Sequence, residues 1–240
     1  MAEATATRTI PILVRDDALI RTVRRHRQPW KSAAVSFRFY DEPASAIRQS
    51  FSNAYIVTNP SLLDDEAALR QISGLIVRDT RLLIFANNYP AQAVLDLISK
   101  LKVRDPKRLH FVGHDLNNKE TYFFRFLTAL GSEDAEESIM DAWWEGDSFI
   151  VTSPLFNRLR VPLEALPVQL RHLTTEDRNH FDIDRYGNYV YWPTMDIHMG
   201  WAQFQQAVDP KARLRVQQRS AAFNRRYGEA IRLLREERGL

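Results

Sequence analysis

The sequence predicts an α/β fold with a doubly wound, five-stranded parallel sheet, followed by a small α+β unit and a C-terminal helical tail. Two features of the first half predict the sheet. Five short apolar runs alternate with amphipathic stretches, which is the element order of a parallel sheet with helices on both faces. The runs show little alternation of apolar and polar residues, as is typical of strands buried on both faces.

The elements of this first half follow one another at short intervals. The expected strands are 9–14, 33–40, 54–57, 82–85 and 109–112, and the expected helices lie near 17–27, 43–50, 62–77, 90–102 and 118–130. Pro90 suits the first turn of its helix, where the missing N–H costs nothing. Asn117 and Glu120 form a capping pair for the last helix.

The second half changes in character. An acidic stretch at 131–141 is expected to be a linker or a short connecting helix, and Gly146-Asp147 predicts a tight hairpin turn between strands at 142–145 and 148–152. A polar helix around 163–178 and two strands at 182–183 and 189–192 complete this unit. The predicted organisation is therefore 1–130, the linker 131–141, a small α+β domain at 142–208, and a tail at 209–240.

Composition excludes several classes of function. With 45% hydrophobic and 26% charged residues, the chain is expected to fold as a globular protein. It has no cysteine, which excludes disulfides, thiolate nucleophiles and cysteine-ligated metals. No apolar run approaches the roughly 20 residues of a membrane helix, so a cytoplasmic protein is expected.

No catalytic or cofactor-binding motif is found. The eight glycines are scattered singly, which rules out a Walker loop and a dinucleotide fingerprint. No serine stands in a Gly-x-Ser-x-Gly elbow. A metal site on His172, His180 and His198 with Asp182 or Asp196 remains an alternative, although unclustered histidines are more often surface or structural residues. We therefore predict no cofactor and no enzymatic activity.

The tail is strongly basic. From Lys211 to Leu240 there are nine basic and three acidic residues, whereas the remainder of the chain carries an excess of negative charge. The candidate contacts to a nucleic acid or another anionic partner are Arg213, Arg215, Arg219, Arg225, Arg226, Arg232 and Arg235. A solvated helix face explains the same charges equally well.

The stretch from the first strand into the first helix, residues 12–20, contains Asp16 and Asp17. It resembles the response-regulator receiver domain, in which an acidic pair ending the first strand helps to hold magnesium. The alternative interpretation is that these carboxylates cap the first helix and offset its dipole.

The receiver pattern is broken at the residues that the chemistry needs. Thr58 and Asn59 stand where the phosphoacceptor aspartate would be, Phe85-Ala86 lacks the Ser or Thr that ends the fourth strand, and His114 follows the fifth strand where a lysine belongs. Without the carboxylate there is no group to phosphorylate in the usual way. The resemblance therefore implies a pseudo-receiver that works through contacts.

Residues 181–196 contain Gly187, Trp192, Pro193 and Asp196 in a Gly-x-x-x-x-Trp-Pro-x-x-Asp arrangement. This pattern resembles a small bacterial family of unknown function, and the match spans about 142–208. The resemblance implies no catalytic residue. We expect Trp192 to anchor the core and Asp196 to cap a helix beginning near Ile197.

Residues 226–240 resemble the first helix of a Cro/repressor-type helix-turn-helix with its following glycine turn. The recognition helix would have to come next. Either the sequence is a truncated form of a longer protein, or the tail is only an amphipathic helix. Its apolar positions, Tyr227, Ile231 and Leu234, are expected to dock on the body or to pair with a second copy.

The function predicted from sequence is that of a non-enzymatic regulator resembling a transcription regulator. Its receiver-like half would act without phosphorylation, and its tail would supply part of a DNA-binding element. A protein-interaction or scaffold module is the first alternative, and a metal-dependent enzyme is the second. The expected partners are a protein or a second copy, with DNA as a candidate for the tail and no membrane.

Overall fold

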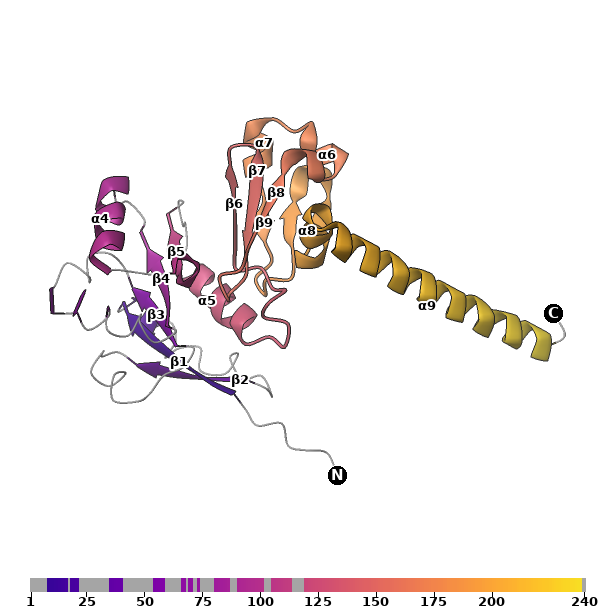
Figure 1. Cartoon of the computed structure of the whole chain (residues 1–240), viewed down its shortest axis with the longest axis horizontal. Coiled ribbons are helices and arrows are strands. Elements are labelled where there is room, and N and C mark those ends of the chain that lie inside the picture. The colour runs from indigo at the N-terminus through magenta and orange to yellow at the C-terminus, as the bar shows by residue number, and fades with distance from the viewer. Residues whose placement is uncertain are drawn as a thin grey trace, which may run out of the picture.

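The computed structural model describes residues 8–16, 18–21, 35–40, 54–58, 66–67, 69–70, 73, 80–86, 90–101, 105–113 and 119–238. Figure 1 shows two lobes side by side, with one long helix extending from the second. Asp17, Asn59, His114, Asn117 and the helix expected at 43–50 lie outside the described residues.

A five-stranded sheet forms the first lobe. Its strands are β1 (Arg8–Arg15), β2 (Val35–Tyr40), β3 (Tyr55–Thr58), β4 (Arg81–Phe85) and β5 (Leu109–Val112). All neighbours are parallel, in the order β2-β1-β3-β4-β5. This is one of the two common orders of doubly wound sheets, so the predicted fold class is confirmed.

Both faces of this sheet are buried, which explains the unbroken apolar runs. Ile12 and Val14 pack with helix α5 (Lys119–Leu130), whereas Leu13 packs on the opposite face with Leu97 of helix α4 (Ala91–Leu101). Successive side chains of a strand point to opposite faces. A strand covered on both sides is therefore apolar at most positions, and Thr58 of β3 and His110 of β5 are the buried polar exceptions among the described strands of this sheet.

The second lobe begins with an antiparallel sheet of β6 (Asp141–Glu145), β7 (Ser148–Thr152) and β8 (Arg158–Pro162). Gly146, with φ of 58°, makes the expected hairpin turn. The prediction of a single helix at 163–178 is wrong. The chain forms three short helical segments there, namely η3 (Leu163–Ala165), α6 (Val168–Arg171) and α7 (Thr175–Asn179). Leu166 is extended (ψ 164°) because it precedes Pro167, and this breaks the helix.

A second small antiparallel sheet follows, made of β9 (Asp182–Ile183), β10 (Val190–Trp192) and β11 (Ile197–Met199). The prediction of a helix near Ile197 is wrong, because the chain there forms β11 and pairs with β10. Asp196 does not cap a helix. It ends the turn η4 (Pro193–Met195) in the left-handed conformation, with φ of 51°, which aspartate tolerates better than most residues. The next helix, α8 (Trp201–Val208), starts only after Gly200.

The acidic stretch between the lobes forms turns over residues 131–138 and no helix. Its last residues are buried. The Ile139 N–H donates to the Gly187 carbonyl at 2.7 Å, and the Met140 N–H donates to the Thr152 carbonyl at 2.8 Å. Met140 also packs in the core beneath the first sheet. The end of this connection is therefore part of the packing between the two lobes.

The tail is one helix, α9 (Pro210–Glu237), of 28 residues, or about 42 Å at 1.5 Å per residue. Ala212 is buried against the body, and beyond it the helix projects away (Figure 1). The tail therefore does not dock its exposed residues Tyr227 and Leu234 on the body, and pairing with a second copy, the other expected arrangement, stays a prediction. The helix runs without a break through residue 226, and no second helix follows it among the described residues. No described helix is long and apolar enough to cross a membrane.

Candidate functional site

The carboxyl edge of the parallel sheet is where a doubly wound fold usually binds its ligand. Four side chains mark this edge. Asp16 follows β1, Thr58 ends β3, Phe85 ends β4, and Lys119 begins α5.

The Asp16 carboxylate is fully engaged by groups of the chain itself. Its Oδ1 accepts from the backbone N–H groups of Ala18 and Leu19, each at 3.1 Å, and its Oδ2 pairs with the ammonium of Lys119. The Lys119 Nζ also lies 5.0 Å from the centre of the Phe85 ring. Asp16 therefore caps the first helix, as the alternative interpretation proposed.

Lys119 is a residue that the sequence analysis missed. The receiver pattern places a lysine directly after the fifth strand, whereas Lys119 lies seven residues beyond β5, in the first turn of α5. Its only sequence signal was a lone cation at the start of a predicted helix. The ion pair joins residues 103 positions apart, so local patterns could not reveal it.

The remaining positions of this edge carry no acidic group among the described residues. Thr58 is fully buried and offers a hydroxyl, and Ala86, 6% exposed, stands where the receiver pattern has Ser or Thr. No group of three His, Asp or Glu side chains able to hold a metal occurs in the described part of the chain. Among the described residues, Asp16 is a helix cap whose charge is paired with that of Lys119.

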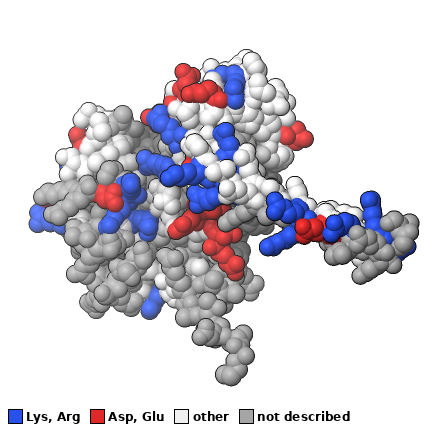
Figure 2. All heavy atoms as spheres, turned by 45° about the vertical axis from the view of Figure 1, so that its right-hand side comes forward, with Lys and Arg blue, Asp and Glu red and all other residues white. Residues whose placement is uncertain are grey.

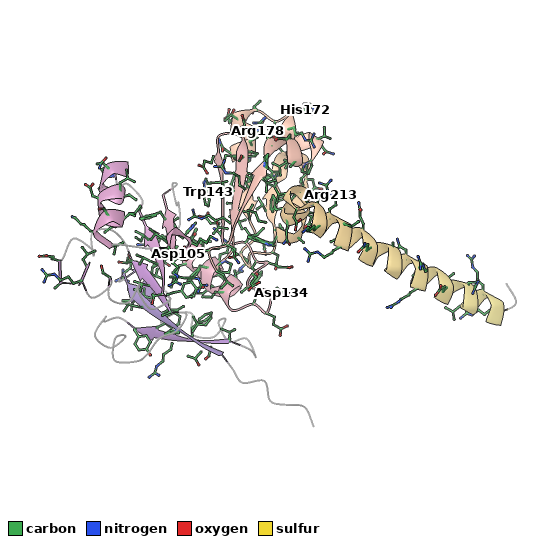
Figure 3. All side chains as sticks on the ribbon, viewed as in Figure 1. Asp105, Asp134, Trp143, His172, Arg178 and Arg213 are labelled. Carbon is green, nitrogen blue, oxygen red and sulfur yellow. The ribbon has the colours of Figure 1, made fainter. Side chains whose placement is uncertain are left out.

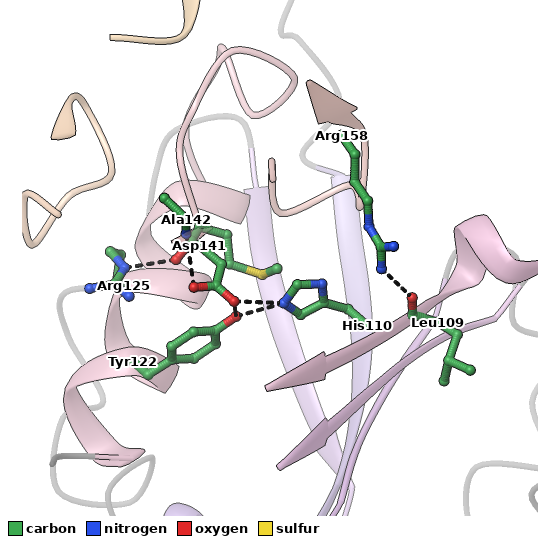
Figure 4. A network of polar contacts seen from close by, with 8 residues as sticks. Leu109, His110, Tyr122, Arg125, Asp141, Ala142 and Arg158 are labelled. Atoms are coloured by element: carbon green, nitrogen blue, oxygen red, sulfur yellow. Dashed lines mark hydrogen bonds and ion pairs between the residues drawn. The ribbon is translucent and has the colours of Figure 1, made fainter. Parts of the chain in front are cut away.

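A second polar cluster lies between the lobes and was not anticipated. His110 of β5, Tyr122 of α5 and Asp141 of β6 are each at most 1% exposed. The His110 Nε2 lies 2.9 Å from the Asp141 Oδ2, and the Tyr122 hydroxyl donates to the same oxygen at 3.2 Å (Figure 4). The other carboxylate oxygen accepts from the Ala142 N–H at 2.9 Å. We call these three side chains the buried triad.

The electrostatics of the buried triad keep the tyrosine protonated. Burial raises the pKa of Tyr122 well above its ordinary value, and the adjacent Asp141 carboxylate raises it further. Burial lowers the pKa of the nearby Arg125, while the Asp141 charge opposes that shift. The Arg125 Nε donates to the Met140 carbonyl at 2.8 Å. The triad is closed to solvent and joins the two lobes, since His110 belongs to the first sheet and Asp141 to the second.

Two aromatic rings lie beside His110 of the buried triad. The His110 ring lies 5.8 Å from that of Trp143 and 5.6 Å from that of Phe156, measured between centroids. Trp143 is placed between the lobes in Figure 3. The Nδ1 of His110 is buried and has no hydrogen-bond partner among the described residues. A proton on Nε2, donated to Asp141, is the tautomer that suits these contacts.

The tail arginines are brought together only as a helical surface. Arg213 lies at the base of α9 (Figure 3), where its Nε donates to the Gln206 carbonyl at 3.3 Å. Arg215 lies 3.7 Å from the Asp209 carboxylate. The arginines that are exposed farther along the helix are Arg225, Arg226, Arg232 and Arg235. Arg219 lies in the same helix, but its side chain is not among those that the structure describes.

The residues of the Gly-x-x-x-x-Trp-Pro-x-x-Asp pattern occupy structural positions. Gly187 has φ of 77°, and a Cβ there would meet the Ile139 carbonyl oxygen at 2.5 Å. Trp192 is fully buried, 5.1 Å from the Phe149 ring. Pro193 opens η4.

Comparisons with known proteins add little to this geometry. No protein-family model matches the sequence, and no match is found among curated proteins. A crystal structure of a response regulator from Colwellia psychrerythraea aligns with 52% of this chain and 98% of its own, at 13% identity and a TM-score of 0.33. A score this low carries no argument, so the receiver-like fold rests on the strand order of the sheet. The resemblance of residues 142–208 to a family stays a prediction.

Proposed function

We propose that this protein is a non-enzymatic regulator in which a receiver-like unit, working without phosphorylation, is rigidly joined to a second unit that presents the basic helix α9. The observation that carries the proposal is the projection of α9, with its arginines exposed, from a body whose lobes share the buried triad (Figure 1). Beyond Arg213 and Arg215 at its base, such a helix presents exposed arginines to an anionic partner.

The two faces of α9 differ in chemistry. At 100° per residue, Val216, Tyr227 and Leu234 fall on one side. The arginines Arg225, Arg226, Arg232 and Arg235 are spread over the remainder of the circumference, which they share with Leu214 and Glu229. A basic helical face is the electrostatic footprint of nucleic-acid binding, because it neutralises phosphates and releases their counterions. We therefore assign duplex DNA as the partner of this face.

Phosphorylating reagents should leave the protein unchanged. With magnesium and acetyl phosphate or beryllofluoride, we expect neither a mass increase nor a change in elution volume, because Lys119 neutralises Asp16 and Thr58 ends β3. A receiver with an intact acceptor aspartate serves as the control for the reagents. Mass spectrometry that found a phosphorylated aspartate within residues 50–65 would refute this part of the proposal.

DNA binding should be weak and strongly dependent on salt. We expect a Kd near 10⁻⁴–10⁻⁶ M for labelled duplex DNA, as in charge-driven binding. The triple variant Arg225→Gln, Arg226→Gln, Arg232→Gln should weaken it at least tenfold. It should also reduce the slope of log K against log salt by roughly 0.9 for each phosphate that the helix no longer neutralises. Fluorescence anisotropy at several salt concentrations measures both.

A matched control removes the same charge from the body. Arg21, Arg70 and Lys100 are exposed and lie on the first lobe, so changing all three to Gln should alter DNA binding by less than threefold. Equal losses in the two triple variants would show that only net charge matters and would remove α9 from the proposal. Tight, sequence-specific binding would show that the part of the protein that recognises bases lies outside α9.

A protein-contact function is the second candidate, because the other face of α9 is apolar. Tyr227 and Leu234 are 60% and 54% exposed, and exposed apolar side chains aligned on one helix favour a protein contact. Changing Val216, Tyr227 and Leu234 to Ser should then abolish partner binding or self-association while leaving DNA binding intact. Sedimentation and anisotropy on the same variant separate the two functions.

A further inference from the structure

We propose that the junction between the two lobes is a binding site for a small phosphate-bearing ligand, held by Lys107 from the first lobe and Arg158 from the second. This site is distinct from the surface of α9. A pocket of about 360 Å³ lies there, lined by Lys107, Phe156, Asn157 and Arg158. Its size falls within the range of small-molecule sites.

The lining is cationic and comes from both lobes. Lys107 belongs to the turn η2 (Pro106–Arg108), which leads into β5, and Arg158 opens β8. The other two lining groups are an amide and an aromatic ring, so no carboxylate competes for the pocket among its described lining residues. Lys107 is exposed, and its ammonium makes no ion pair with any described residue. On the face in Figure 2, lysine and arginine side chains gather between the lobes.

Arg158 is already positioned for a ligand. Its terminal nitrogen donates to the Leu109 carbonyl at 3.0 Å across the junction (Figure 4), which orients the guanidinium. Arginine has five N–H donors in a planar fork, so this contact leaves others available. The fork matches two oxygens of a phosphate group, and the Lys107 ammonium supplies a second positive charge.

The turn that carries the pocket is held in an unfavourable conformation. Phe156 has φ of 65°, which is a rare value for a bulky residue. Its N–H donates to the Ser153 carbonyl at 2.8 Å, and the Ser153 N–H donates to the Asn157 carbonyl at 2.9 Å. The Phe156 ring packs against His110 of the buried triad. Backbone strain that the surroundings hold in place is concentrated at ligand sites.

The neighbouring charges strengthen the choice of an anion. Asp105, two residues before Lys107, accepts from the Lys107 N–H at 3.0 Å and lies 3.5 Å from the Arg108 guanidinium, so its charge is already paired. The Arg81 Nε donates to the Leu155 carbonyl at 3.2 Å, which places another cation beside the turn. A phosphate has the charge and the acceptors to satisfy Lys107 and Arg158 together.

Calorimetric titration of the full chain tests the site. The probes are inorganic phosphate, pyrophosphate and adenosine monophosphate, with succinate as a carboxylate and sodium chloride to match ionic strength. We expect saturable binding of at least one phosphate probe, and at least tenfold weaker binding by Lys107→Gln and by Arg158→Gln. Succinate should bind at least tenfold more weakly than that phosphate probe.

The control is Arg160→Gln, two residues along β8, whose side chain pairs with Glu145 at 2.7 Å. It should bind phosphate as the parent protein does. Lys107→Gln removes an exposed side chain, so its folding is expected to be intact, and circular dichroism verifies this. Absence of saturable binding to every phosphate probe, unchanged binding by Lys107→Gln, or an equal loss in Arg160→Gln would overturn the proposal. Preferential binding of succinate would overturn the ligand class.

Discussion

Replacing Trp192 with alanine should lower the free energy of unfolding by about 3–5 kcal/mol, the usual cost of truncating a buried Phe or Trp. Trp192 is fully buried and lies within 5.8 Å of the Phe181 ring and 6.5 Å of the Phe204 ring. Its Nε1 also donates to the Arg178 carbonyl at 3.2 Å. The substitution would leave a cavity, while the Arg178 carbonyl would keep the hydrogen bond that it accepts from the Trp144 Nε1 at 2.9 Å. Chemical denaturation followed by circular dichroism measures the loss.

Tyr186→Ala is the matched control, since this aromatic side chain belongs to the same lobe and is 49% exposed. It should change the stability by less than about 0.5 kcal/mol. If Trp192→Ala does not fold, the milder Trp192→Phe should still unfold at a lower denaturant concentration than the parent. A loss under about 1 kcal/mol for Trp192→Ala would contradict its role in the core and favour a role in binding.

Replacing Asp141 with alanine should also lower the free energy of unfolding, by about 1–3 kcal/mol for each buried donor that loses its acceptor. His110 and Tyr122 would lose the carboxylate oxygen that both contact, and the Ala142 N–H would lose the other oxygen. Because His110 and Asp141 belong to different lobes, we expect both lobes to lose stability together. Hydrogen exchange of the two sheets measures this.

A double-mutant cycle separates the network from packing. Asp141→Ala and Tyr122→Phe remove partners of the same contact, so their combined loss should fall short of the sum by at least about 0.5 kcal/mol. Asp147→Ala, in the exposed hairpin turn, is the control and should be nearly neutral. Additive losses, or destabilisation of only one lobe, would show that the buried triad does not couple the lobes.

The predictable part of the fold was the five strands, α4 and α5 of the first lobe and the first hairpin of the second. A strand covered on both faces is mostly apolar, so the run at 54–57 could be assigned without any tertiary information, and it overlaps β3 with a shift of one residue. The hairpin could be predicted because Gly146 supplies the positive φ that its turn requires. These signals are local, since each depends on residues that are neighbours in the chain.

The sequence alone therefore determined the parallel sheet, the hairpin and the basic amphipathic tail. Tertiary structure decided the rest, because the deciding contacts join residues far apart in the chain. Asp16 meets Lys119, and His110 meets Asp141, only after the sheet and its helices have assembled. The chain at 197 became a strand because it pairs with β10. Likewise, only the first turn of α9 packs against the body, so the remainder of the helix projects. The periodicity of the helix could not reveal how much of it the body covers.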